Sequence, residues 1–308
     1  MKVYLAGERS ATVGANGYFE GWAAYARRRL FSFYYHGYSQ GGHGVLDATG
    51  ASLDITQSVQ ANMDLFLDSG AFTGFTKKKE IPVEEYGAYL NKYGHLFTTR
   101  SNLDDTSKNE KKSYNNQKAL ESMGCVVQPV FHAREDVAWL VKYLDEGYDY
   151  IFIGGMVPES TQWLTGWLDW LWEKYLSNPD GTPRVKTHGF GLTDQKLMFR
   201  YPWHSVDSTS WLMTGIFGAA MFRVGTDIRK IVFSDESPEA RKFQGWHYNR
   251  LPRESQRVVD TWLEPFSLTA AQLSSHYSFR DIVNAATFQQ LEDMGATHYK
   301  PEMAGLFT

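Results

Sequence analysis

Short apolar runs alternate with amphipathic segments along most of this chain. The run Leu65-Phe66-Leu67 ends on Asp68, and consecutive apolar residues of this kind are typical of a strand buried on both faces of a parallel sheet. Most runs lie roughly 25 to 35 residues apart, which is the length of a strand–helix unit with its loops. The pattern predicts eight strands, at 2–7, 31–36, 65–70, 95–100, 125–132, 149–155, 184–191 and 203–208.

Helical periodicity fills the intervals between these runs. In 83–94, three tyrosines and a leucine recur at i, i+3, i+4 and i+7 after Pro82, which suits the first turn of a helix. Further helices are predicted at 134–147, 160–176, 193–201 and 278–295, the last with Ser278 and Asp281 as a capping box. Strands that alternate with helices predict an α/β fold with a parallel sheet. Eight strands favour a closed (β/α)8 TIM-type barrel, with an open doubly wound sheet as the alternative.

After residue 210 the alternation fades and the charge pattern changes. Residues 223–257 carry eight Lys or Arg against five acids. We therefore expect a barrel core over 1–215, and over 216–308 a basic, helical C-terminal extension packed on the barrel.

Composition narrows the class of protein. A formal net charge of -4 argues against a protein that coats nucleic acid by bulk attraction, although a local basic face is compatible with it. No window approaches the roughly 18 uncharged apolar residues that a membrane span needs, and Glu8 and Arg9 interrupt any signal-peptide core. The single cysteine, Cys125, excludes an internal disulfide and a multi-cysteine zinc site. We expect a soluble cytoplasmic enzyme that does not engage membranes.

The ends of the predicted strands carry acids, amides and glycines. In a barrel these ends form one rim, where catalytic residues gather. Two carboxylates on separate strands can divide one displacement, one as nucleophile and the other as proton handler, and glycosyl transfer uses such a pair. Individual acids can instead cap helices, so this pattern alone names no substrate. The rim residues are Asp68, Asp104, Asp105, Gln128, His132, Gly154, Gly155, 188–191 and Asp207.

Several short motifs over about 65–210 resemble, in order, those of the tRNA-guanine transglycosylase superfamily. They are LDSGAF, SNLDDT, VVQPVF, IGGMVPES, THGFGLT and SVDS. The family's zinc site uses three cysteines and a histidine after the nucleophile strand, and here no cysteine follows Cys125. His247, His276 and His298 are too widely spaced to favour a replacement site. These losses fit the phage and bacterial branch (DpdA-like) that inserts 7-deazaguanine bases into DNA, which would place the protein in the host cytoplasm if phage-encoded.

The resemblance implies a role for each rim residue. Asp207 would attack C1′ of a target guanosine and form a covalent glycosyl-enzyme intermediate, and Asp68 would remove a proton from the incoming 7-deazaguanine base, such as 7-cyano-7-deazaguanine. It implies no cofactor. Since a base inside a duplex is unreachable, the target nucleotide must be flipped or single-stranded. The expected substrate-binding residues are Asp104 (or Asp105, one position on), Gln128, the Gly154-Gly155 backbone, Ser69 and Phe190, which is otherwise a core aromatic.

Contact with the DNA backbone is expected from the basic segment 223–257. Its candidate residues are Lys242, Arg250, Arg253 and Arg257, although an ordinary solvated surface has the same composition. The basic runs at 27–30 and 76–80 are weaker candidates. Without the family's zinc region, which supports dimers there, we expect a monomer or a weak homodimer.

Three alternative functions remain open at this point. One is the tRNA enzyme itself, and another is a non-catalytic subunit that binds nucleic acid for a partner. The third is a hydrolase with a divalent metal on Asp68, Asp104, Asp207 and either His132 or His188, although no tight ligand pair marks such a site.

Overall fold

The computed structural model describes residues 1–7, 18–38, 46–107, 109–157, 159–237 and 246–300. The chain forms two compact units. The first consists of Met1–Ser10, Arg28–Ser208 and Gly295–Thr308, and the second of Ala11–Arg27 and Thr209–Met294. The sequence-based border at 215/216 stays a prediction, and each unit is described by itself.

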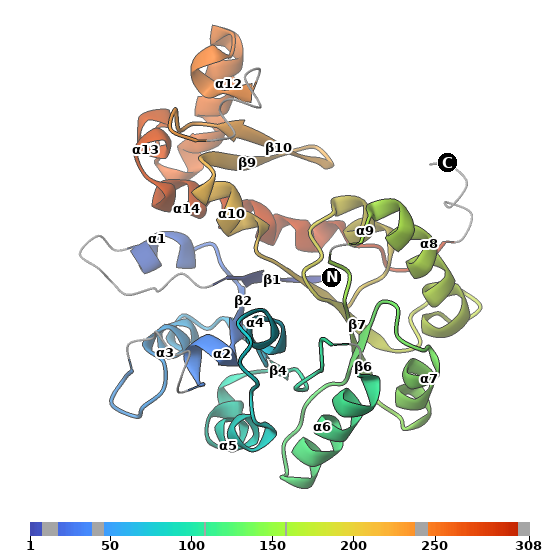
Figure 1. The fold of residues 1–308 in the computed structure, drawn as a ribbon. Coiled ribbons are helices and arrows are strands. Elements are labelled where there is room, and N and C mark those ends of the chain that lie inside the picture. The colour runs from blue at the N-terminus through green and yellow to red at the C-terminus, as the bar shows by residue number, and fades with distance from the viewer. Residues whose placement is uncertain (8–17, 39–45, 108, 158, 238–245, 301–308) are drawn as a thin grey trace. The chain divides into compact units, whose positions relative to one another are not determined.

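The first unit is built on an eight-stranded, wholly parallel sheet (Figure 1). The strand order is β4-β3-β2-β1-β8-β7-β6-β5, so the first and last strands pair at its centre, as they do in a (β/α)8 fold. The predicted strand number and parallel direction are confirmed. The strands are β1 (Lys2–Ala6), β2 (Arg28–Ser32), β3 (Asp64–Asp68), β4 (Thr99–Arg100), β5 (Val130–His132), β6 (Tyr150–Gly154), β7 (Lys186–Gly189) and β8 (Ser205–Ser208).

The sheet curls towards closure, but it is not the closed barrel that the sequence predicted. Its edge strands, β4 and β5, are only two and three residues long. Between them the described residues form one isolated parallel bridge, Ser101 to Gln128. There the Gln128 N–H donates to the Arg100 carbonyl, and Asn102 N–H donates to the Gln128 carbonyl, both at 2.9 Å. Beyond Asn102 the chain leaves the sheet as the loop that carries Asp104, so the ladder is not continued.

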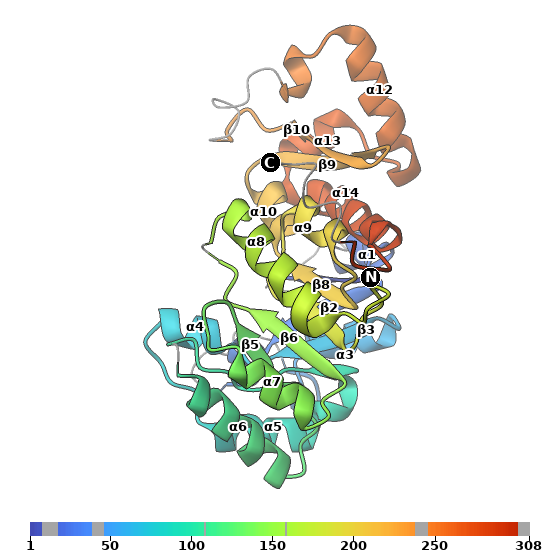
Figure 2. The same cartoon turned by 90° about the vertical axis from the view of Figure 1, so that its right-hand side faces the viewer.

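The helices of the first unit surround this sheet (Figures 1 and 2). They are α2 (Phe33–His36), α3 (Leu53–Gln60), α4 (Ala71–Thr76), α5 (Val83–Tyr93), α6 (Glu110–Ser122), α7 (Ala138–Asp145), α8 (Thr161–Leu171) and α9 (Gln195–Arg200), with a π-helical segment at Trp172–Leu176. Ser160 caps α8 by accepting the Trp163 N–H. The predicted strand at 31–36 is wrong, because β2 begins at Arg28 and 33–36 is helical. An apolar pattern misses this strand because it opens on two arginines, Arg28 and Arg29. The buried guanidinium of Arg29 lies 4.3 Å from the centre of the Phe31 ring.

The interior of the curled sheet is packed with side chains rather than open. Tyr4, Leu30, Phe66, Val130 and Phe152 come from five different strands and form one buried cluster. The rings of Phe66 and Phe152 lie 5.1 Å apart. Aromatic and aliphatic side chains therefore fill this part of the sheet interior.

The second unit contains a β-hairpin and a set of helices. The antiparallel strands β9 (Ala219–Val224) and β10 (Asp227–Val232) were not among the predicted elements. The helices are α1 (Tyr18–Ala23), α10 (Ser210–Ile216), α12 (Arg253–Leu263), α13 (Ala270–Ser275) and α14 (Tyr277–Gln289), with 3-10 turns at Tyr248–Arg250, Glu264–Phe266 and Gln290–Met294. Phe222, Phe233, Leu263 and Val283 belong to its core.

The predicted capping box of the last helix is wrong. The His276 side chain caps α14 by accepting the Ser278 N–H, and Asp281 is completely buried. The capping box lies instead at the start of α13, where Thr269 and Gln272 exchange hydrogen bonds. Among the described residues, no helix has both the length and the apolar character that a membrane crossing requires.

Candidate active site

Three carboxylates from different parts of the sequence interact at the carboxyl ends of the strands. Asp68 is the last residue of β3, Asp104 lies in the loop after β4, and Asp207 is on β8. Burial raises the pKa of Asp68 to about 8, and the charges of Asp104 and Asp207 add to this rise. The Gly70 N–H donates to the Asp68 carboxyl at 3.0 Å and opposes it. Asp68 therefore carries a proton at neutral pH.

Asp207 is held by two hydrogen-bond donors, both on its Oδ1 atom. The His188 Nε2 lies 3.2 Å from this oxygen and the Gly191 N–H donates to it at 2.8 Å. Gly191 has φ +61°, a conformation that favours glycine and that aims this N–H at the carboxylate. In the described part of the chain, the second oxygen, Oδ2, accepts no hydrogen bond.

A buried chain of hydrogen bonds behind Asp207 sets the tautomer of His188. His188 is completely buried, and this burial lowers its pKa in spite of the neighbouring Asp207, so the ring is neutral. Its Nδ1 lies 2.5 Å from the Ser205 hydroxyl, which lies 2.5 Å from the Tyr150 hydroxyl. Because Nε2 faces an acceptor, it carries the hydrogen, and Nδ1 accepts from Ser205. Asp207 Oδ1 thus receives a hydrogen bond from a neutral donor.

Asp104 contacts a second histidine, His132, which is charged, whereas His188 is neutral. His132 Nε2 lies 2.9 Å from Asp104 Oδ2, and its Nδ1 lies 3.1 Å from Glu135 Oε1. Burial lowers the pKa of His132, but hydrogen bonds to Asp104 and Glu135 and their charges raise it to about 10 overall. The ring is therefore an imidazolium that donates to both carboxylates.

The glycine pair at the end of β6 makes room for this histidine. A Cβ on Gly154 would lie 2.6 Å from the His132 ring, and one on Gly155 would lie 3.0 Å from the His132 Cβ. The Gly154 carbonyl already accepts the Ala133 N–H at 2.9 Å, whereas Gly155 is exposed. Of the predicted Gly154-Gly155 backbone contacts, only those of Gly155 face an open surface.

The adjacent acids Asp104 and Asp105 have different partners. Asp105 accepts hydrogen bonds from Ser107 and forms an ion pair with Lys112 at 3.2 Å. Although burial would raise its pKa, these partners lower it. Asp105 therefore orders the loop before α6, and Asp104 is the acid that faces His132.

The remaining predicted substrate contacts differ in exposure. Ser69 is completely buried, and its hydroxyl lies 3.4 Å from Asp104 Oδ1, so it orients that carboxylate. Gln128 is partly exposed, and its side-chain amide makes no hydrogen bond with the described residues. Phe190 packs against the interior cluster, with its ring 4.7 Å from that of His188, but it remains partly exposed.

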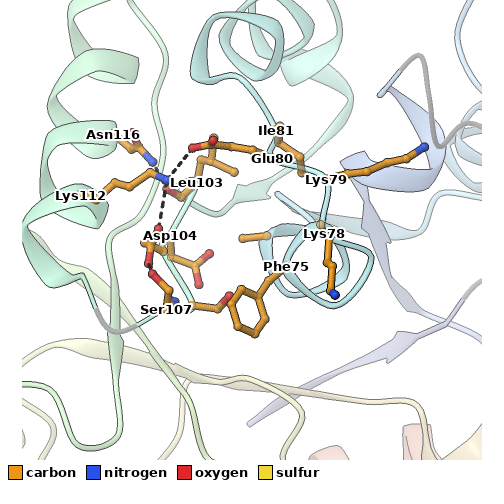
Figure 3. Close-up of a pocket in the computed structure, with 14 residues that line it drawn as sticks. Phe75, Lys78, Lys79, Glu80, Ile81, Leu103, Asp104, Ser107, Lys112 and Asn116 are labelled. Carbon is orange, nitrogen blue, oxygen red and sulfur yellow. Dashed lines mark hydrogen bonds and ion pairs between the residues drawn. The ribbon is translucent and has the colours of Figure 1, made fainter.

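A pocket of about 390 Å³ opens beside Asp104, between α4 and the loop 103–107 (Figure 3). Phe75 and Lys78 of the α4 region and Asp104 line it. At its upper edge in the figure, Lys112 forms an ion pair with Glu80. The same Lys112 also pairs with Asp105. Charged, polar and apolar side chains line the pocket, and Phe75, which is 57% exposed, gives it an aromatic face.

The predicted nucleic-acid contacts lie in the second unit. Arg250 ends a 3-10 turn, and Arg253 and Arg257 lie one turn apart on α12. All three are exposed, and in the described residues none of them forms an ion pair. Lys242 lies outside the described residues. Of the weaker run 27–30, Arg28 pairs with Asp64 and Arg29 is buried, so neither is a free surface cation.

No group of three or more His, Cys, Asp or Glu side chains within the described ranges is arranged to hold a metal ion. His132 and His188 each donate to a carboxylate instead. In the C-terminal region, His247 accepts the Asn249 N–H and His276 caps α14. His298 bonds to its neighbour Thr297. Within the described ranges, these side chains therefore form no ligand set of the kind that the metal-dependent hydrolase would need.

Sequence reasoning missed three residues that organise this site. They are Glu135, Ser205 and Tyr150. Each forms part of a hydrogen-bonded chain that ends on a rim residue. The spacing of His132 and Glu135 at i, i+3 was the one available signal.

Comparison with known proteins does not identify the chain. No protein-family model matches this sequence, and a search of curated proteins finds no match either. The function proposed below rests on the geometry of the site and on the short motifs.

Proposed function

We propose that this protein is a glycosyltransferase of the base-exchange type, a DNA-guanine transglycosylase that replaces guanine in DNA by a 7-deazaguanine base. One observation carries the proposal. Two neighbouring carboxyl groups lie in different surroundings: Asp68 is an acid with a raised pKa, and Asp207 has two hydrogen-bond donors on Oδ1 and, among the described residues, none on Oδ2. In glycosyl transfer, two carboxyl groups in different surroundings divide the roles of proton donor and nucleophile.

The first half-reaction removes guanine. Asp207 Oδ2 attacks C1′ of the target nucleotide, and the C1′–N9 bond breaks with its electron pair moving onto the purine. The Asp68 carboxylic acid gives its proton to the departing base, so neutral guanine leaves and Asp68 becomes a carboxylate. The sugar is then joined to Asp207 as a glycosyl ester.

The second half-reaction installs the new base. The incoming 7-deazaguanine loses its N9 proton to Asp68, and N9 displaces Asp207 from C1′. Asp207 is released as a carboxylate and Asp68 regains its proton. Two displacements at C1′ leave the configuration of the sugar unchanged.

Binding of the base is assigned to groups beside these acids. Asp104 presents an acceptor, and the Gln128 amide is partly exposed without a partner among the described residues. The exposed arginines Arg250, Arg253 and Arg257 supply phosphate contacts, which is the usual use of unpaired arginines on a nucleic-acid-binding surface.

A base-exchange assay tests the proposal. Labelled guanine or 7-cyano-7-deazaguanine is offered with DNA and, separately, with tRNA, using wild-type protein, Asp207→Ala and Asp68→Ala. Asp149→Ala is the matched control, because it removes a carboxylate with an 81% exposed side chain away from the site. Label should enter DNA with wild-type and control protein, but not with the two site variants.

The outcomes separate the alternatives. Label that enters only tRNA keeps the chemistry and changes the substrate. If label enters neither nucleic acid although both are bound, the base-exchange reaction is refuted and a binding subunit is favoured. Asp68→Ala should still form the covalent intermediate with substrates whose leaving base needs little protonation. Denaturing gels of labelled DNA would reveal this intermediate as DNA that stays attached to the protein.

A further inference from the structure

His132 lies between two carboxylates and has no role in the proposed reaction steps. It donates to Asp104 Oδ2 at 2.9 Å on one side and to Glu135 Oε1 at 3.1 Å on the other. Glu135 also accepts the His132 backbone N–H at 2.9 Å, and its side chain is only 3% exposed. The ring and the backbone N–H of His132 are thus both bound to Glu135 at the end of β5, an arrangement called here the His132–Glu135 pair.

The His132–Glu135 pair leaves one carboxylate oxygen of Asp104 available to a ligand. The Oδ2 atom accepts from His132, whereas among the described residues Oδ1 accepts only from the Ser69 hydroxyl, at 3.4 Å. The side chain of Asp104 is 10% exposed, and it borders the pocket of Figure 3. A ligand that reaches Asp104 therefore meets Oδ1.

The neighbouring acid makes the charge of Asp104 matter. The charge of Asp104 adds to the rise in the pKa of Asp68, and two carboxyl groups that interact in this way can share one proton. A cation on Asp104 alone removes this ambiguity, because it stabilises the negative charge there. The proton then stays on Asp68.

We propose that His132, held by Glu135, is a positioning residue that keeps Asp104 acceptor-only, and that it thereby makes this subsite select bases with N–H donors on their pyrimidine edge. Guanine-type bases present an N1–H and an exocyclic amine there, whereas adenine-type bases present an N1 acceptor. An Asp104 that carried a proton would bind the adenine-type edge as well. This inference rests on the proposed base-exchange function, because it assigns the base to Asp104.

Two variants separate the charge of His132 from its hydrogen bond. Glu135→Gln keeps an acceptor for the His132 backbone N–H and places an amide NH₂ against Nδ1, so the ring becomes neutral while Nε2–H still donates to Asp104. His132→Gln replaces the ring by a neutral donor that needs less space beside Gly154. His95→Gln, at an exposed histidine of the same unit, is the matched control.

Affinities for two free bases, 7-cyano-7-deazaguanine and 7-deazaadenine, are measured by titration calorimetry at pH 7. We expect the preference for the guanine-type base to fall by about 10-fold or more in both site variants, because a charge-assisted hydrogen bond is replaced by a neutral one. His95→Gln should keep the wild-type preference. In parallel, the ring nitrogen shifts of His132 report its charge by NMR, with an imidazolium expected in wild type at pH 8 and a neutral ring in Glu135→Gln.

Each outcome is decisive. A preference that is unchanged in both variants overturns the assignment, as does a neutral His132 ring in wild type at pH 7. If His132→Gln does not fold, Glu135→Gln alone decides through the same two measurements. A wild-type protein that binds neither base refutes the base-exchange function itself, and the specificity role falls with it. Selective binding in wild type that neither variant alters refutes only the role of His132.

Discussion

Replacing Asp68 by Asn should make the protein more stable, by an amount that grows with pH. The asparagine has nearly the shape of the protonated acid and keeps an acceptor for the Gly70 N–H, which donates to Asp68 at 3.0 Å. It lacks the proton that Asp68 must release when the chain unfolds. The comparison therefore isolates one ionisation and needs no substrate.

The sign and size follow from the raised pKa. Burial raises the pKa of Asp68 from 3.8 to about 8 in the folded state, while the unfolded chain keeps the ordinary value. Between these two values the unfolded state has lost the proton and the folded state has kept it, so stability falls as pH rises. The wild-type free energy of unfolding should fall relative to the variant by about 1.4 kcal/mol per pH unit, or about 2.7 kcal/mol from pH 5 to pH 7. Above pH 8 the difference should level off.

Urea denaturation of both proteins at pH 5, 6, 7 and 8 measures this difference. Asp105→Asn is the control, since the hydrogen bonds from Ser107 and the Lys112 ion pair lower the pKa of Asp105. Its stabilising contribution is complete above the ordinary carboxyl pKa and is lost only at lower pH, so its difference from wild type should be constant over this range. A constant difference for Asp68→Asn as well would refute the raised pKa and, with it, the role of Asp68 as a proton donor.

Three further predictions test other parts of the molecule. Asp207→Ala should abolish base exchange and leave the affinity for DNA, measured by fluorescence anisotropy, within about two-fold, because phosphate contacts dominate that affinity. Reversing the charges of Arg250 and Arg253 to Glu should weaken binding to all DNA sequences and flatten its salt dependence, and an unchanged affinity would exclude α12 as the contact surface. Ser205→Ala should cost about 1–3 kcal/mol in urea denaturation, because it leaves two buried groups without their hydrogen-bond partner; a smaller loss would mean that the chain behind Asp207 is not continuous.

The strands were predictable where local pattern and structure agree. Phe66 and Phe152 lie in short apolar runs of strand length, with polar or glycine residues at their ends, and these runs identified β3 and β6. The same rule failed at β2, because Arg29 is buried against Phe31 of its own strand and bonds to Ser58 of α3, 29 residues further along the chain. Polar residues that are paired after folding cannot be recognised as buried from sequence alone.

The hairpin of the second unit was also missed, although a local signal existed. Gly225 and Thr226 form a two-residue connection between paired strands, and Gly225 has φ +64°. A glycine at the first position of such a turn is a known hairpin signal. The charged residues at the tip of the hairpin concealed it, because they interrupt the apolar pattern that marks a strand.

The sequence by itself determined which residues reach the rim, since a carboxylate that ends a buried strand can lie only where that strand leaves the core. Asp68 and Asp207 were located in this way. Only the tertiary structure decided their chemistry. The raised pKa of Asp68 depends on burial and on Asp104 and Asp207, and the charge of His132 depends on Asp104, 28 positions earlier in the sequence, and on Glu135. Protonation depends on the electric field of all neighbouring groups, and the fold alone brings those neighbours together.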